Sequence, residues 1–189
     1  FGYDAATHRP TPLSDSERAA LRSQLCFVGN HTSERAALLT QLAGSYEVGI
    51  WGISWRERLP ADSPLRACLR GAWTHGQTMS KVFGAADIVL NFVRAQNGQA
   101  HNMRTFEAPA SGAFMLSTRT RDQLNWLPEG VGAAYFADAD ELQAQAAHYL
   151  AHPGERARIA AEGHRRITSG AHTYGDRMRQ LMDVVETLQ

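Results

Sequence analysis

Residues 25–51 read LCFVGNHTSERAALLTQLAGSYEVGIW, and this stretch decides the fold class. The apolar run at 25–28 fits a short buried strand, and Thr32 or Ser33 fits the N-cap of a helix that Gly44 ends. A second apolar run follows at 46–51. A strand, a helix and another strand in this order form a βαβ unit, which joins two parallel strands.

The same alternation continues through the rest of the chain. The apolar runs and the helical periodicity predict further strands at 87–92, 113–117 and 131–136, and helices at 78–85, 102–112, 138–151, 155–167 and from 173 onward. Strands alternating with helices predict an α/β fold, a Rossmann-like doubly wound parallel sheet covered on both faces. Such sheets bind ligands beyond the carboxyl ends of their strands, so a site is expected in the loops at 29–33, 52–58, 74–78 and 93–102.

Two helices near the C-terminus carry more detailed signals. Asp138 and Glu141 have the spacing of a capping box, so Asp138-Ala-Asp140 is assigned to a helix cap rather than to a metal motif. In the last helix a stripe of apolar side chains predicts packing on the domain, and its members are Met178, Leu181, Val185 and Leu188.

Composition and charge narrow the class of protein. The chain has 189 residues, with 19 Lys plus Arg and 19 Asp plus Glu, so it lacks the basic excess of a nucleic-acid binder. Its apolar runs are far shorter than the ~20 residues of a transmembrane helix, and its N-terminus lacks the pattern of a secretory signal. With only Cys26 and Cys68 there is no disulfide framework, so we expect a cytoplasmic protein.

The domain limits follow from the same composition. Residues 1–24 hold Pro10 and Pro12 and little apolar periodicity, which predicts an interdomain linker, and residues 25–189 then form the domain. The chain does not begin with Met, so we expect a piece of a longer protein.

Several common site motifs are absent. The run Gly130-Val-Gly132 leads into a strand and has Tyr135 where a dinucleotide fingerprint has its third glycine. There is no P-loop and no Gly-x-Ser-x-Gly nucleophile motif. His148 and His152 are four residues apart, but without a third ligand nearby they fit solvated histidines better than a zinc site, and no metal site is expected.

The segment 91–107 combines the residue types that bind a nucleoside diphosphate. It follows a strand and contains amides, Arg94, Arg104 and Glu107. Backbone N–H groups at a helix start near Asn102 attract phosphate, and Arg104 adds a charge-assisted bond to the same anion. A carboxylate such as Glu107 accepts hydrogen bonds from a ribose diol. The alternative is that Arg104 and Glu107 are a surface ion pair, and the spacing alone leaves both interpretations open.

Glycine and aromatic residues give further candidates with two interpretations each. Gly29 and Asn30 allow close approach of a ligand, or form a simple turn. Trp51 and Trp55 can stack on a base or sugar, but can also be core residues. Trp73, His75 and Gly76 share this ambiguity, with backbone contacts to a base as the functional option.

The order and spacing of several motifs resemble a known family. They are Phe27-Val-Gly-Asn30, Trp51-Gly-Ile-Ser-Trp55, Ala86-Asp-Ile-Val-Leu-Asn91, Asn102-Met-Arg-Thr-Phe-Glu107, Ala110-Ser-Gly-Ala-Phe-Met-Leu116 and His172-Thr-Tyr174. Together they resemble the nucleotide-binding half of group 1 glycosyltransferases, in the CgeB-like branch. Gly2-Tyr-Asp4 and His8-Arg-Pro10 resemble the segment that leads into this half.

The resemblance implies a GT-B architecture, in which this chain is the C-terminal domain that binds the nucleotide-sugar donor. It implies a glycosyltransferase of hexosyltransferase type, whose missing N-terminal domain holds the acceptor, so the fragment alone has little activity. The donor is a UDP-sugar by default, no cofactor is required, and the acceptor is unknown. Neither a nucleic acid nor a transmembrane segment is implied.

The resemblance also assigns residues. Related retaining enzymes carry Glu-x7-Glu, of which Glu107 matches the second, while Gln99 stands at the first and leaves the sugar contact and the stereochemistry open. The family's Arg and Lys after the first strand are not evident, so Arg35, Arg94 or Arg104 are the substitutes at the diphosphate. Arg104 and Gln99 are the predicted catalytic residues, and the predicted donor-binding residues are Gly29, Asn30, Trp55, His75, Gly76, Arg94, His101, Asn102, Met103, Arg104 and Glu107.

Two other functions fit the same residues. A catalytically silent nucleotide-sugar-binding module is consistent with the absent first Glu, and a sugar-nucleotide epimerase has the same GT-B layout.

Overall fold

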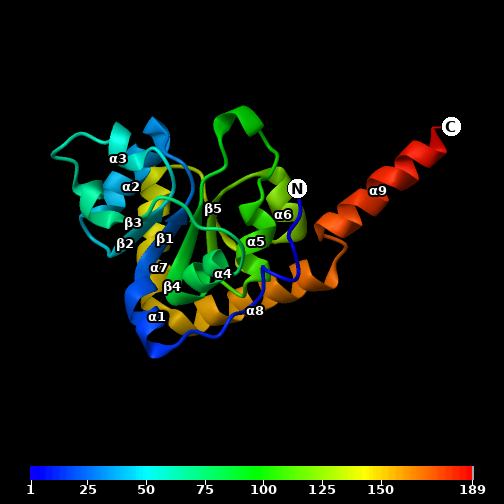
Figure 1. Ribbon diagram of the computed structural model, residues 1–189, viewed down its shortest axis with the longest axis horizontal. Helices are drawn as coiled ribbons and strands as arrows, with labels where there is room; N and C mark the ends of the chain where they lie inside the picture. The colour runs from blue at the N-terminus through cyan, green and yellow to red at the C-terminus, as the bar shows by residue number, and fades with distance from the viewer. Residues whose placement is uncertain (189) are drawn as a thin grey trace.

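The computed structural model describes residues 1–188 of the chain. Six strands form the sheet: β1 (Ser23–Val28), β2 (Val48–Trp51), β3 (Leu69–Gly71), β4 (Ala86–Asn91), β5 (Met115–Thr118) and β6 (Ala134–Phe136). The helices are α1 (Asp15–Leu21), α2 (Ser33–Ala43), α3 (Trp55–Arg58), α4 (Gly76–Ala85), α5 (Arg104–Ala110), α6 (Arg121–Trp126), α7 (Ala139–Ala151), α8 (Pro153–Ser169) and α9 (Tyr174–Thr187), with 3-10 turns η1 (Pro64–Cys68) and η2 (Ala95–Asn97). Figure 1 shows their arrangement.

All six strands are parallel, in the order β3-β2-β1-β4-β5-β6. The chain runs outward from β1 to β3 in one direction and then returns to β4 on the other side of β1. The predicted α/β doubly wound sheet is therefore confirmed. The reversal of direction lies between β1 and β4, and in open sheets of this kind a crevice forms at that point.

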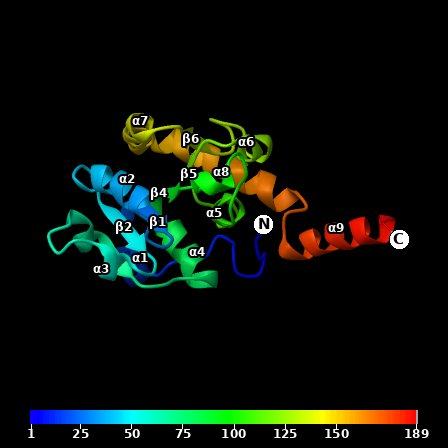
Figure 2. The ribbon, with the colours of Figure 1, turned by 90° about the horizontal axis from the view of Figure 1, so that it is seen from above.

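Helices cover both faces of the sheet (Figure 2). Alternate residues of β1 point to opposite faces: Leu25 and Phe27 join the core under α2 and α7, whereas Cys26 and Val28 join the core under α4 and α5. Two apolar cores result, and the strands read as continuous hydrophobic runs because both of their faces are buried.

The predicted helix caps are confirmed at two positions. The side chain of Thr32 accepts the N–H of Arg35, and that of Asp138 accepts the N–H of Glu141, so Asp138-Ala-Asp140 is a cap. The sequence pattern does not predict β3, which is only three residues long and partly exposed, or the short helices α3 and α6.

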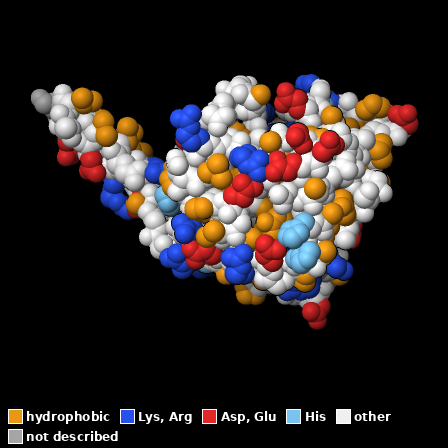
Figure 3. All heavy atoms as spheres, turned by 180° about the vertical axis from the view of Figure 1, so that it is seen from behind, with side chains coloured by type: hydrophobic (Ala, Val, Ile, Leu, Met, Phe, Trp, Pro, Cys, Tyr) orange, Lys and Arg blue, Asp and Glu red, His pale blue; other side chains and the backbone are white. Residues whose placement is uncertain are grey.

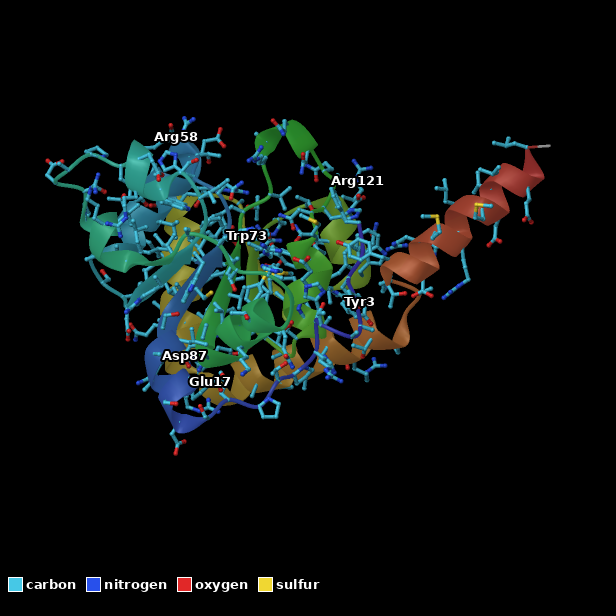
Figure 4. The ribbon with its side chains drawn as sticks, viewed as in Figure 1. Tyr3, Glu17, Arg58, Trp73, Asp87 and Arg121 are labelled. Atoms are coloured by element: carbon cyan, nitrogen blue, oxygen red, sulfur yellow. The ribbon has the colours of Figure 1, made fainter. Side chains whose placement is uncertain are left out.

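Residues 1–24 hold regular structure and make contacts with the rest of the chain. Ser14 and Glu17 form a complete capping box for α1, and β1 begins at Ser23, so the predicted boundary after residue 24 falls inside a strand. The backbone of Tyr3 pairs with the start of α9, accepting the N–H of Tyr174 and donating to the carbonyl of His172. Figure 4 shows Tyr3 close to the start of α9. The predicted domain limit at residue 189 lies outside the described residues.

The prediction that α9 packs on the domain is wrong. This helix projects from the body of the molecule (Figures 1 and 2), and the side chains of the predicted stripe are 40–81% exposed. Figure 3 shows hydrophobic side chains along one side of the projecting helix and acidic side chains along another. The periodicity identified an amphipathic helix correctly, but amphipathicity does not specify what covers the apolar side.

Removal of residues 178–189 is therefore expected to change the free energy of unfolding by less than about 0.5 kcal/mol, because surface segments contribute little to stability. Urea denaturation followed by tryptophan fluorescence measures this quantity. The truncation keeps the Thr173 cap and the contact of Arg177 with Phe1. Burying one large apolar side chain contributes about 1.5–3 kcal/mol to the free energy of unfolding. If the truncation lowered that free energy by about 2 kcal/mol or more, the apolar stripe would pack on the domain in solution.

Within residues 1–188, no helix is both long and apolar enough to cross a bilayer. Cys26 is fully buried in the sheet and burial raises the pKa of its thiol far above the usual value, whereas Cys68 is half-buried in η1.

Candidate functional site

The candidate site lies where β1 and β4 end side by side. Beyond β1 the chain turns through Gly29 and Asn30 toward α2, and beyond β4 it continues through Phe92 and Arg94 into η2. The connection after β1 leads to α2 on one face of the sheet, and the connection after β4 leads to α5 on the other face. In sheets of this kind, a ligand crevice forms between two such connections at the carboxyl edge.

Two arginines donate to backbone carbonyls at or just beyond the ends of β1 and β4. Arg35, on the first turn of α2, donates from its guanidinium to the carbonyls of Asn30 (3.0 Å) and Phe92 (3.1 Å), and so ties the two loops together. Arg104, the first residue of α5, donates from Nε to the carbonyl of Val28 at 3.2 Å. Each guanidinium also lies near an aromatic ring, Arg35 at 5.3 Å from the centre of Phe27 and Arg104 at 5.8 Å from that of Phe83.

The charge of this cluster is only partly compensated. Among residues 1–188, neither Arg35 nor Arg94 forms an ion pair with a carboxylate. Burial, and then the nearby charges of Arg94 and Arg104, lower the pKa of Arg35 to about 10. The partly buried guanidinium groups of Arg35 and Arg104 and the exposed one of Arg94 favour the binding of an anion, because its charge offsets their repulsion.

Glu107 and Arg104 are ion-paired, but not at the surface. The Glu107 side chain is 7% exposed and that of Arg104 is 20% exposed, and Oε2 of the carboxylate accepts from the guanidinium. Of the two interpretations that the spacing left open, an ion pair is present, but it is largely buried and does not lie at the surface. Oε1 of Glu107 faces Nε2 of His8 at 3.8 Å.

A buried polar network fixes the position of α5. The Nδ2 of Asn102 donates to Oδ1 of Asn91 at 2.7 Å, and Nδ2 of Asn91 in turn donates to Ser117 and Gln123. Thr105 donates to the same oxygen of Gln123 at 3.1 Å. Asn102 was a predicted site residue, but the network residues Ser117 and Gln123 were not. The sequence signal for the network is a polar residue near the carboxyl end of each of two buried strands, Asn91 in β4 and Ser117 in β5.

Gln99 and His101 lie toward α6. Oε1 of Gln99 accepts the backbone N–H of Arg121 at 3.1 Å, which satisfies a donor at the start of that helix. Figure 4 labels Arg121, the first residue of α6. Nδ1 of His101 is 3.2 Å from Asp122 and its ring packs edge-on against Trp126, and burial lowers its pKa. Met103 is exposed just before α5.

Trp55 is 1% exposed, so it has no surface for stacking on a ligand. Its indole N–H donates to the carbonyl of Gly29 at 2.8 Å, and this hydrogen bond holds the loop after β1 against the core. A Cβ on Gly52 would lie 2.0 Å from that same carbonyl oxygen, so this position accepts only glycine. Trp51 is likewise a core residue.

Trp73 and His75 form an exposed pair on the connection from β3 to α4. Their rings stack with centres 4.3 Å apart, and Trp73 is 71% exposed. Figure 4 labels Trp73. Gly76 follows with φ of 55°, a left-handed conformation that favours glycine.

A cavity of about 340 Å³, lined by residues 52–57 and 69–72, adjoins the connection from β3 to α4. A second cavity, of about 280 Å³, includes Arg35 and Arg94 in its lining.

Two residues that were not assigned to the site approach Glu107. His8 comes from the segment before α1, and Tyr174 is the first residue of α9. Burial, and secondarily the charge of Glu107, raise the pKa of Tyr174. His8 lies in the motif His8-Arg-Pro10 and Tyr174 in the motif His172-Thr-Tyr174. The resemblance of these two motifs to the family was the sequence signal that could have assigned both residues to the site.

Known proteins share this fold. A model of the family described as glycosyl transferase-like matches residues 31–183. No curated protein matches the sequence. The fold is similar to that of sucrose-phosphate synthase from Thermosynechococcus elongatus (14% identity, all of this chain and 52% of that one, TM-score 0.69). It is also similar to Anabaena HepE in complex with UDP and glucose (11% identity, 98% of this chain and 55% of that one, TM-score 0.72).

A third structure is the C-terminal domain of a group 1 family glycosyl transferase from Francisella tularensis, at 11% identity, with 89% of this chain and 97% of that one covered and a TM-score of 0.63. The chain thus spans about half the length of the two longer structures and most of an isolated C-terminal domain. The family model covers most of the sequence, and the chain belongs to the glycosyl transferase-like family.

Proposed function

We propose that this chain is the donor-binding domain of a glycosyltransferase and binds a nucleoside diphosphate sugar at the crevice between β1 and β4. The observation that carries the proposal is the position of Arg35 and Arg104 on the backbone carbonyls where β1 and β4 end: Arg35 and Arg94 form no ion pair among the described residues, and Arg104 is paired with Glu107. The two phosphates of a nucleoside diphosphate supply the missing negative charge, and each guanidinium offers several donors to their oxygens. The bound UDP of the HepE structure, with a similar fold, supports the same ligand class.

The arginines then assist the transfer step. The anomeric carbon of the sugar bonds to a hydroxyl oxygen of the acceptor, which gives up its proton, and the C–O bond to the diphosphate breaks. The electron pair of that bond leaves with the diphosphate, whose negative charge increases. Guanidinium groups already held by the carbonyls of Asn30, Phe92 and Val28 meet this charge with little reorganisation. One preorganised donor of this kind contributes about 3–4 kcal/mol to the stability of a transition state.

The remaining residues receive roles that fit their positions. Oε1 of Glu107 accepts from a ribose hydroxyl, and Trp73 with His75 contacts the base. Gln99 contacts the sugar through its amide nitrogen, which has no partner among the residues that the structure describes. Trp55, His101 and Asn102 hold the loops in place instead of touching the donor. We propose UDP as the default nucleotide, membership of the CgeB-like branch and a cytoplasmic location.

A catalytically silent binding module is the second candidate. It is favoured by Gln99, because a neutral amide cannot supply the charge of a carboxylate at the sugar. A full-length protein that transfers or hydrolyses the donor, and loses this activity in Arg104→Ala, is an enzyme. Tight nucleotide binding without turnover identifies the module.

Replacement of Arg35 by alanine tests the proposal in the chain as it stands. We expect the affinity for UDP to fall about 10- to 100-fold, since a hydrogen bond to a charged group contributes about 1.5–3 kcal/mol. Titration calorimetry measures the affinity. The matched control is Arg165→Ala, which removes an exposed arginine of α8 and should leave it unchanged. Equal affinity in wild type and Arg35→Ala would contradict the proposed site.

A further inference from the structure

The residues before α1 form a closed turn that ends at His8. The backbone N–H groups of Thr7 and His8 both donate to the carbonyl of Asp4, at 3.2 and 2.8 Å. The Asp4 carboxylate accepts from the N–H of Ala6 at 2.9 Å, and the Asp4 N–H donates to Nδ1 of His8 at 3.1 Å. The imidazole is therefore part of the turn, and its orientation is fixed by the backbone.

The turn is anchored to the body of the domain on two sides. Ser80 of α4 donates to the carbonyl of Thr7 at 2.9 Å and also contacts Ser111. Tyr3, just before the turn, is bonded to the start of α9. His8 is only 7% exposed as a result.

The hydrogen bonds determine where His8 carries its proton. Because Nδ1 accepts from Asp4, it has no hydrogen, and the neutral ring carries its hydrogen at Nε2. A protonated ring would place a hydrogen on Nδ1 against the Asp4 N–H. Burial lowers the pKa of His8, with smaller opposing effects of Glu107 and Asp4, and this favours the neutral ring. Its Nε2–H then faces Oε1 of Glu107, 3.8 Å away.

We propose that His8 is a positioning residue for Glu107, acting through its Nε2–H, and that it makes nucleotide affinity depend on the folded turn before α1. This inference rests on the proposed function of Glu107. The two carboxylate oxygens of Glu107 have different partners. Oε2 accepts a hydrogen bond from Arg104, and Oε1 is oriented by the Nε2–H dipole of His8. Asp4 and Tyr174 are the other titratable groups that act on this cluster.

Two substitutions separate the role of Nδ1 of His8, which accepts from Asp4, from that of Nε2, which faces Glu107. In His8→Asn the amide oxygen replaces Nδ1 as the acceptor for Asp4, and the donor toward Glu107 is lost. In His8→Gln the longer side chain places an amide N–H near the position of Nε2. We expect His8→Asn to weaken UDP binding about fivefold, and His8→Gln to restore most of this loss, with similar melting temperatures for both. In a Glu107→Gln background, His8→Asn should have no further effect, because the residue acts through that carboxylate.

A measurement without nucleotide tests the contact itself. In ¹H–¹⁵N spectra of the wild type, His8 should show the Nε2–H tautomer, and Glu107→Gln should lower its pKa further, since the carboxylate raises it. An Nδ1–H tautomer overturns the inference, as does equal UDP affinity of wild type and His8→Asn. A wild-type chain that binds no nucleoside diphosphate refutes the proposed function instead, and the tautomer and the His8 pKa still report on the contact.

Discussion

Replacement of Arg104 by methionine is expected to lower the free energy of unfolding by about 3 kcal/mol and to reduce UDP binding at least tenfold. The stability is lost because Glu107, 7% exposed, is left buried without its cation. The affinity is lost because the proposed diphosphate contact is removed. Urea denaturation gives the first quantity, and titration calorimetry at a temperature where the variant stays folded gives the second.

A double variant separates the two effects. Arg104→Met combined with Glu107→Leu replaces the buried pair with apolar side chains, a change that is often neutral or stabilising. We expect the double variant to recover most of the lost stability while UDP binding stays weak. Wild-type stability and affinity in Arg104→Met alone would contradict both the burial of the pair and the proposed role of Arg104.

Gly52→Ala is expected to destabilise the chain by about 2–3 kcal/mol and to weaken UDP binding as well. The new Cβ would lie 2.0 Å from the Gly29 carbonyl oxygen and 3.0 Å from the Trp55 indole nitrogen. A backbone carbonyl held by a core tryptophan moves only if the loop after β1 moves, and overpacking of this kind costs about 1–3 kcal/mol. Thermal unfolding and calorimetry with UDP measure the two effects.

Gly44→Ala is the matched control. Gly44 ends α2 in a right-handed helical conformation and has no atom within 4 Å of a built Cβ, so alanine is tolerated there. We expect equal or slightly higher stability, by about 0.4–1 kcal/mol, because alanine restricts the unfolded chain. If Gly52→Ala were as stable as Gly44→Ala, the close approach of the two loops would not exist in solution.

The parallel sheet was predictable because its signals are local. The apolar run at 25–28, the cap at Thr32 and the apolar run at 46–51 stand in one stretch of chain. β3 was not predictable in this way, because three partly exposed residues carry no periodicity and the strand is defined by its pairing with β2. The exposure of the apolar stripe of α9 was also not predictable, since periodicity identifies the apolar side of a helix but not what lies against it.

The same limit applies to the candidate site. The pairing of Arg104 with Glu107 follows from their spacing of three on a helix, but its burial does not. The contact of Arg35 with Phe92 joins residues 57 positions apart and depends on the adjacency of β1 and β4. For Trp55 the sequence allowed both stacking on a ligand and a place in the core, and only the packed structure distinguishes them.

The central claim is that a diphosphate binds between the guanidinium groups of Arg35 and Arg104, where β1 and β4 end. The most direct measurement is a crystal structure of this chain grown with UDP. The account predicts phosphate density in contact with both arginines and the ribose next to Glu107. Well-defined UDP at any other place, with both arginines still bonded only to protein carbonyls and Glu107, would contradict it.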